Sequence, residues 1–397
     1  MAFDPDLQKK LDERMTRHVE TGETGGIAWL ASCDGTVVTG AAGVLTRGEP
    51  APVEQDSLFR IASVTKPLTA VAALLLVEEC RLRLEDPVDH LLPELADRRV
   101  LVDPLGPIDG DTVPAERPIT VRDLLTMQCG LGMDFTAPWP QPLLDAMGAL
   151  GLSPGAPEPQ VPPEPDEWLR RMGTLPLLRQ PGERWLYNTA SDILGVLVGR
   201  AAGVPFDRFL RERVLEPLGM LDTTFSTTAT DRLGTSYAVD PETGERSVYD
   251  EPEGKWSMPP AFPSGAAGLV STVDDLAAFG TMLLADGFLP DGSRLLSRAS
   301  VAAMTTDQLG VAAGLHPSIS VDGSQGWGFG VGVQVRRTGV ARNVGAYGWD
   351  GGLGSSWAND PAEDLVGVVL STDMFSGAAA LPHPLADFWT TVYAALD

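Results

Sequence analysis

Apolar and polar positions follow two different periods along the chain, and these periods predict where helices and strands lie. Residues 6–21 repeat apolar positions every three to four residues, which is typical of an amphipathic helix. Residues 26–32 with their neighbours, and residues 36–43, are two apolar runs separated by Asp34-Gly35. That dipeptide favours a tight turn, so the two runs predict a β-hairpin.

The middle of the chain predicts helices and loops, whereas its end predicts strands. From Ser63 to Glu79 the residues are apolar on nearly all sides, which indicates a helix buried on every face. Nine prolines between residues 138 and 165 predict a long irregular segment. The remaining expected elements are two helices at 188–202 and 272–284, four strands at 327–336, 341–347, 353–359 and 364–372, and a last helix at 384–396.

Strands at both ends of the chain, with helices between them, predict one sheet assembled from the two termini. We therefore expect an α+β protein with an inserted, mostly helical part. Residues 1–80 and 255–397 would form the sheet region, and residues 81–254 the inserted helical and loop-rich region, within a single structural unit.

Composition and charge narrow the classes of partner. The chain has 397 residues, of which 43% are hydrophobic, so it is long enough to bury a real core. Its formal net charge of −25 argues against nucleic acid and anionic membrane surfaces as partners. No stretch approaches the ~20 apolar residues of a membrane span. The first residues contain no apolar leader segment, so we expect a cytoplasmic protein.

The histidines predict neither a metal site nor a firm catalytic triad. No two of the four lie at the spacing of helical metal ligands, so we expect no structural zinc, and the chemistry below requires no cofactor. A Ser-His-Asp triad through His316 or His383 stays open, because the sequence identifies no acidic partner for either of them.

Ser63 and Lys66 form the pair on which a hydrolytic function depends. A serine hydroxyl is a poor nucleophile until a neighbouring base removes its proton. A lysine three residues later lies on the same helical face, and burial would lower its pKa from ~10.4 toward the neutral form that accepts protons. The chain contains only four lysines. The alternative interpretation is a helix-capping serine beside a lysine that extends to solvent.

A second serine motif is interpreted as fortuitous. Residues 151–155 read G-L-S-P-G, which matches the nucleophile-elbow pattern G-x-S-x-G. In such an elbow the residue after the serine donates a backbone N–H to the oxyanion, and here that residue is Pro154, which has none. We therefore expect Ser153 to play no part in catalysis.

Several blocks of sequence resemble one enzyme superfamily. They read LFRIASVTKP (58–67), ITVRDLLTMQCGL (119–131), GERWLYNTASDILGVLVGRAAG (182–203), PLGMLDTTF (217–225), PSGAAGLVSTVDDLAAFGTMLLADG (263–287) and YGWDGGLGSSWANDP (347–361). In this order they resemble the serine β-lactamase and penicillin-binding-protein superfamily, most closely family VIII carboxylesterases and class C β-lactamases. The resemblance implies a β-lactamase-like fold, with an antiparallel sheet of N- and C-terminal strands flanked by helices.

The resemblance also implies roles for single residues. Ser63 matches the acylated nucleophile and Lys66 its partner, while Tyr187 matches the tyrosine that relays the proton to the leaving group. The third motif of the superfamily corresponds to Trp349-Asp350-Gly351-Gly352, which would contact substrate. By the superfamily pattern, the backbone N–H groups of Ser63 and Gly352 would form the oxyanion hole.

Two departures from the superfamily pattern affect the expected substrate. Asn188 follows the tyrosine directly, and Thr189 stands where the second motif usually has its asparagine. Trp349 replaces the third-motif lysine, a cation thought to recognise substrate carboxylates. An indole offers apolar area and one N–H donor, which suits a neutral acyl or alkyl group.

The leading hypothesis is therefore a serine hydrolase that cleaves small carboxylic esters through an acyl-enzyme on Ser63. Three rivals stay open. They are a β-lactamase, D-amino-acid peptidase or amidase with the same machinery, an acyltransferase that passes the acyl group to an alcohol or amine, and a non-catalytic binding protein that kept the fold. In the leading hypothesis and in the first two rivals, the expected partner is a small-molecule substrate.

Overall fold

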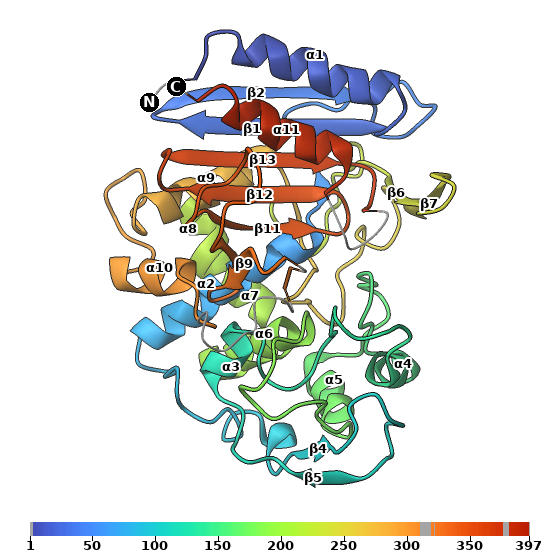
Figure 1. Ribbon diagram of the computed structural model, residues 1–397, viewed down its shortest axis with the longest axis vertical. Coiled ribbons are helices and arrows are strands. Elements are labelled where there is room, and N and C mark those ends of the chain that lie inside the picture. The colour runs from blue at the N-terminus through green and yellow to red at the C-terminus, as the bar shows by residue number, and fades with distance from the viewer. Residues whose placement is uncertain (1–2, 310–318, 321, 376–380, 397) are drawn as a thin grey trace.

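The computed structural model describes residues 3–309, 319–320, 322–375 and 381–396. Its largest sheet has seven strands in the order β2-β1-β13-β12-β11-β10-β9, and every neighbouring pair is antiparallel (Figure 1). Both ends of the chain supply it, so the expected α+β arrangement is confirmed. The strands are β1 (Gly26–Cys33), β2 (Thr36–Gly43), β9 (Gln325–Trp327), β10 (Gly332–Gln334), β11 (Tyr347–Gly351), β12 (Ser355–Asp360) and β13 (Leu365–Ser371).

The two faces of this sheet are covered by different helices. Helices α1 (Leu7–Glu20) and α11 (His383–Tyr393) pack together on the outer face (Figure 1). Side chains of β1 alternate between the faces, as a strand requires. Ile27 and Trp29 therefore join the core under α1 and α11, whereas Ala28 and Leu30 join the larger core on the helical side.

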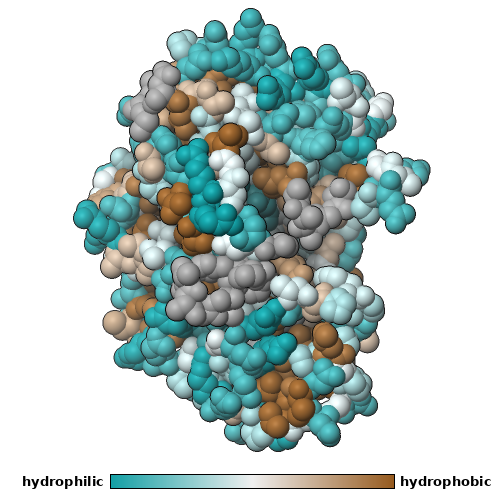
Figure 2. All heavy atoms as spheres, in the orientation of Figure 1, coloured by the Kyte–Doolittle hydropathy of each residue, from teal (hydrophilic) through white to brown (hydrophobic). Residues whose placement is uncertain are grey.

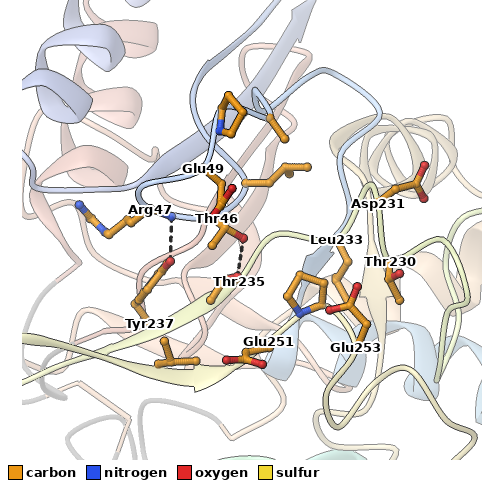
Figure 3. Close-up of a pocket in the computed structure, with 15 residues that line it drawn as sticks. Thr46, Arg47, Glu49, Thr230, Asp231, Leu233, Thr235, Tyr237, Glu251 and Glu253 are labelled. Atoms are coloured by element: carbon orange, nitrogen blue, oxygen red, sulfur yellow. Dashed lines mark hydrogen bonds between the residues drawn. The ribbon is translucent and has the colours of Figure 1, made fainter.

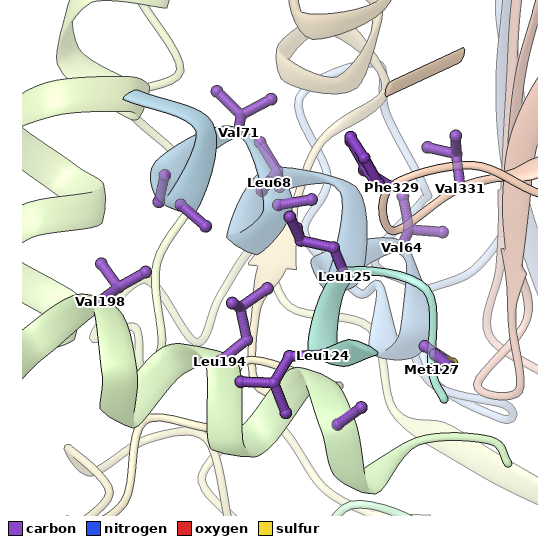
Figure 4. Packing of buried hydrophobic residues seen from close by; sticks show 14 of the residues in the cluster. Val64, Leu68, Val71, Leu124, Leu125, Met127, Leu194, Val198, Phe329 and Val331 are labelled. Carbon is purple, nitrogen blue, oxygen red and sulfur yellow. The ribbon is translucent and has the colours of Figure 1, made fainter. Parts of the chain in front are cut away.

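Helix α2 (Thr65–Glu78) lies at the centre of the larger core. Leu68 and Val71 on this helix contact side chains of α3 (Val121–Leu125) and α6 (Thr189–Ala202), and Phe329 closes the same cluster (Figure 4). From Thr65 to Leu76 every residue of α2 is buried. The prediction of an enclosed helix is thus confirmed, and it carries Lys66 into the interior.

Two of the predicted strands have different bounds in the structure. The expected strand 327–336 is two strands, β9 and β10, because the chain turns at residues 328–331, where Gly330 has φ +75° and packs against Ala70 of α2. The expected strand 341–347 begins only at Tyr347, after turns at Arg342 and Gly345 with positive φ. As a result, Trp349 lies inside a strand.

The remaining elements connect and surround this framework. Hydrophilic residues gather over α1 on the face shown in Figure 2. Within the described residues, no helix is long and apolar enough to cross a bilayer. The other elements are β3 (Phe59–Arg60) with β8 (Val270–Ser271), β4 (Arg99–Leu101) with β5 (Thr112–Pro114), β6 (Ser236–Val239) with β7 (Arg246–Asp250), α4 (Pro142–Ala149), α5 (Pro165–Met172), α7 (Phe206–Leu210), α8 (Glu216–Leu218), α9 (Val273–Leu284) and α10 (Arg298–Thr305).

The expected division at residues 81 and 254 stays a prediction. The large core cluster contains residues of the sheet, such as Leu30 and Val368, together with residues of the inserted region, such as Trp168 and Leu197. The sheet and the inserted helices therefore share one hydrophobic core.

Candidate active site

Ser63 lies in a single turn of 3-10 helix, Ala62–Val64, directly before α2. Strands β11 and β12 contact the backbone that precedes Ser63 in the chain. Ser355 Oγ donates a hydrogen bond to the Ile61 carbonyl at 2.8 Å. Gly351 approaches the same carbonyl so closely that a Cβ there would lie 2.3 Å from its oxygen. The position of the serine is therefore set by β11 and β12 as well as by its own helix.

Lys66 is fully buried, and its ammonium group has three hydrogen-bond acceptors. Nζ lies 3.0 Å from Ser63 Oγ, 2.8 Å from Asn188 Oδ1 and 2.7 Å from the Ala266 carbonyl oxygen. These acceptors match the three donors of a protonated lysine. Burial nevertheless lowers the pKa of Lys66 to about 7, because desolvation disfavours the charged form, while the carboxyl of Asp192 acts in the opposite direction.

The ring of Tyr187 also faces the ammonium group of Lys66. Its ring centre is 4.5 Å from Lys66 Nζ, and Trp349 Nε1 donates a hydrogen bond to its hydroxyl oxygen at 2.7 Å. Burial raises the pKa of Tyr187 to about 12, although hydrogen bonds with Ser63 and Trp349 lower it. The pKa of Tyr187 therefore lies well above neutral pH, whereas that of Lys66 lies close to it.

A strained turn lets two successive residues face Lys66. In an extended chain the side chains of Tyr187 and Asn188 would point to opposite sides. Asn188 instead has φ +84° and ψ −66°, and Thr189 N donates to the Tyr187 carbonyl at 3.3 Å. This is a γ-turn with positive φ, a rare and strained form. Asn188 thereby reaches the lysine, while Thr189 is buried at the start of α6.

The structure separates the four residues of the expected third motif. Trp349 faces Tyr187, and Gly351 packs on the backbone before Ser63. Gly352 follows the strand and is exposed. Asp350 points to the outer face of the sheet, where it accepts hydrogen bonds from Ser356 Oγ at 2.5 Å and from Arg342 Nη2 at 3.2 Å. The expectation that Asp350 contacts substrate therefore does not fit its position, because alternation along β11 directs it away from Ser63.

Several groups around the site were not anticipated from the sequence. Ala266 and Asp192 carry no motif of their own, although Asp192 is one helical turn after Asn188 and so shares its face. Phe135 is 39% exposed and stacks at a tilt on Tyr187, with the ring centres 5.0 Å apart. Nothing in the loop sequence around Phe135 indicates this contact.

The histidine alternative gains no support from the described residues. His383 starts α11 on the outer face of the sheet, with an 85% exposed side chain. His316 lies outside the described residues. In the part of the chain that the structure describes, no group of three or more His, Cys, Asp or Glu side chains is arranged to hold a metal ion.

A large hollow lies at a different place from these groups. A cavity of about 590 Å³ opens between the loop after β2 and the β6–β7 hairpin (Figure 3). Its charged lining residues are mostly acidic and include Glu49, Asp231, Glu251 and Glu253, and Ser63 is not among its lining residues. The buried lysine, and not this cavity, therefore marks the candidate active site.

Comparisons with known proteins identify relatives of this chain. The sequence profile of the Beta-lactamase family matches residues 10–387. Protein Rv1367c from Mycobacterium tuberculosis is 39% identical over 325 residues, which cover 79% of this chain and 77% of that protein. Esterase EstB from Burkholderia gladioli is 32% identical over 376 residues, covering 89% of this chain and 87% of that protein.

A solved structure has the same architecture over its whole length. EstCE1, described as a hydrolase with promiscuous acyltransferase activity, superposes with a TM-score of 0.80 at 26% identity, covering 98% of each chain. The expected β-lactamase-like fold is therefore confirmed. Esterases and acyltransferases of this fold are the chain's relatives, and over nearly its whole length the chain belongs to the Beta-lactamase family.

Proposed function

We propose that this protein hydrolyses small carboxylic esters through an acyl-enzyme formed on Ser63. One observation carries the proposal: Lys66 Nζ lies 3.0 Å from Ser63 Oγ, in a buried site that brings the pKa of the lysine to about 7. A general base works best when its pKa lies near the working pH. Lys66 meets that condition next to a hydroxyl that needs a base.

The proton follows a short route in this proposal. As Ser63 Oγ bonds to the acyl carbon, its proton moves to neutral Lys66. Tyr187 then gives its hydroxyl proton to the departing alkoxide and takes a proton from Lys66. Both side chains thereby return to their starting protonation states. A water molecule then attacks the acyl carbon, and the same groups carry its proton back to Ser63 Oγ as the acid is released. The backbone N–H groups of Ser63 and Gly352 are the proposed donors to the oxyanion.

The surroundings of Tyr187 favour an uncharged substrate. The indole N–H of Trp349 is already bonded to the tyrosine, and Phe135 extends the aromatic surface on the other side. The nearby cation Arg342 is paired with Asp350 on the outer face. A neutral acyl group suits these neighbours better than the carboxylate of a β-lactam or a peptide. A nucleic acid or membrane partner is not part of the proposal, and the cytoplasmic location stays a prediction.

Acyl transfer to an alcohol is the second candidate. The same acyl-enzyme can be attacked by an alcohol in place of water, and EstCE1, with a TM-score of 0.80, is described as having this activity as a side reaction. If candidate alcohols added to the assay divert product from the free acid to a new ester, transfer competes with hydrolysis. If the free acid stays the only product, hydrolysis stands alone.

Nitrophenyl esters of short acids test the proposal. We expect wild type to turn over, and Ser63→Ala to lose nearly all activity because the attacking oxygen is gone. Mass spectrometry after a brief reaction should find the acyl group on the peptide that contains Ser63. Ser153→Ala is the matched control, since it removes the other motif serine and should leave turnover unchanged. Full activity in Ser63→Ala, or a loss of similar depth in Ser153→Ala, would contradict the proposal.

A further inference from the structure

Asp192 is a buried acid beside the active site. It lies in the first turn of α6, is 7% exposed, and accepts hydrogen bonds from Ser264 Oγ at 2.6 Å and from Ala266 N at 3.1 Å. Within the described residues, no lysine or arginine forms an ion pair with it. An isolated buried carboxylate is costly, so its retention needs a physical reason.

The turn that Asp192 holds also holds Lys66. The N–H of Ala266 donates to Asp192, and the carbonyl of the same residue accepts from Lys66 Nζ at 2.7 Å. Gly265 is wedged between two helices. Its carbonyl accepts from Thr69 Oγ1 of α2 at 2.8 Å, and a Cβ there would lie 2.4 Å from the carbonyl oxygen of Ser191 in α6. One residue, Ala266, thus links the acid to the lysine through a turn with little room to move.

Other charged groups around this pair are already engaged. Glu158 lines a small cavity of about 30 Å³ together with Asp192, but its carboxylate pairs with Lys255 Nζ at 2.8 Å. Asp350 raises the pKa of Tyr187 and is paired with Arg342. Ser63, Tyr187 and Asn188 are the other groups that face Lys66. Asp192 is the acid whose charge acts on the lysine.

We propose that Asp192 is a positioning residue that sets the pH range in which Lys66 works. It fixes the Ala266 carbonyl that accepts from Lys66, and its negative charge stabilises the ammonium form of the lysine. The inference rests on the proposed function, since it requires Lys66 to accept the proton of Ser63. Burial raises the pKa of Asp192 above its ordinary value, although the hydrogen bond from Ser264 and the attraction to Lys66 act in the opposite direction. Those two partners are what favour the ionised form.

The sign of the effect follows from the charge. The ionised form of Asp192 favours protonated Lys66, so in that form the pKa of the lysine is higher than it would be beside a neutral group. Lys66 must be neutral to accept a proton, so the acidic limb of kcat/KM reports this pKa in the free enzyme. Removing the charge should therefore move the acidic limb to lower pH.

Asp192→Asn removes the charge and keeps the size and one acceptor. We expect its acidic limb to move down by about one pH unit, with a lower kcat from the loosened turn. Asp275→Asn is the matched control. Asp275 is also buried (8% exposed) and also accepts from one hydroxyl, Thr223 Oγ1 at 2.7 Å, and one backbone amide, Asp222 N at 3.0 Å. Asp275 lies on α9 and makes no contact with Lys66. The acidic limb of kcat/KM in Asp275→Asn should therefore not move.

Ser264→Ala keeps the experiment decisive if Asp192→Asn does not fold. Without the Ser264 hydroxyl the carboxylate of Asp192 is less favoured, so the acidic limb should move in the same direction by a smaller amount. The inference would be overturned if every folded variant of the two, Asp192→Asn and Ser264→Ala, kept the acidic limb of wild type, as Asp275→Asn should. That result would leave the role of Ser63 intact. Full turnover in Ser63→Ala would instead overturn the proposed function itself.

Discussion

Lys66 lies 4.5 Å from the ring centre of Tyr187, and Lys255 lies 3.8 Å from that of Tyr249. Both pairs combine the same two side chains at similar distances. Lys255 is 28% exposed and forms an ion pair with Glu158 at 2.8 Å. Lys66 is fully buried, and its ammonium meets a hydroxyl, an amide oxygen and a backbone carbonyl in place of a carboxylate.

The difference shows which feature prepares a lysine to act as a base. A carboxylate in direct contact stabilises an ammonium group, and Lys255 has such a partner in Glu158. Neutral acceptors stabilise the ammonium less, and burial lowers the pKa of Lys66 to about 7. The tyrosines differ as well. Tyr249 donates its hydroxyl to the Pro157 carbonyl, whereas the hydroxyl oxygen of Tyr187 receives the indole N–H of Trp349.

The largest expected effect comes from removing one lysine of the two. Lys66→Met should lower kcat/KM by about 10³-fold, because the proton of Ser63 then has no acceptor. In wild type, kcat/KM should rise with pH as Lys66 loses its proton near its pKa of about 7. Lys255→Met is the control and should keep nearly full activity. Equal losses in the two variants would show that burial does not distinguish the lysines.

The two tyrosines give the next comparison. Tyr187→Phe should lower kcat by about 10²-fold, since the leaving alkoxide loses its proton donor while the ring stays in place. Tyr249→Phe removes the same hydroxyl from the pair formed with Lys255 and should leave kcat unchanged. Steady-state kinetics on one alkyl ester, whose alkoxide leaving group needs a proton, measures both. A substrate whose leaving group needs no proton should be less sensitive to Tyr187→Phe; equal sensitivity would argue against a relay.

The smallest expected effect concerns the hydrogen bond that only Tyr187 receives. Trp349→Phe removes the indole N–H and keeps an aromatic ring beside the tyrosine. A hydrogen bond of this kind is worth about 1 kcal/mol, so we expect a loss of about 5- to 10-fold in kcat. Trp139→Phe, at a 61% exposed tryptophan, is the control. A loss confined to KM would mean that Trp349 serves substrate binding and does not orient Tyr187.

Local pattern was sufficient for much of the fold. The hairpin of β1 and β2, the enclosed helix α2 and the helix that begins after Asn188 all follow from short-range periodicity and turn residues. The strand bounds around residues 328–331 and 341–346 were missed, because the strands there are interrupted by turns with positive φ at Gly330, Arg342 and Gly345. The placement of Asp350 was missed for a related reason, since the face to which a residue points depends on where its strand begins.

By itself, the sequence determined the pair Ser63 and Lys66, because a spacing of three residues at the start of a helix brings two side chains together whatever surrounds them. Only the tertiary structure decided which groups meet that pair. Asn188 and Ala266 are 122 and 200 positions away from Lys66 in the chain, and Asp192 reaches it through Ala266. The pKa of about 7 also belongs to the assembled molecule, since desolvation arises only when the helices and the sheet have closed around the lysine.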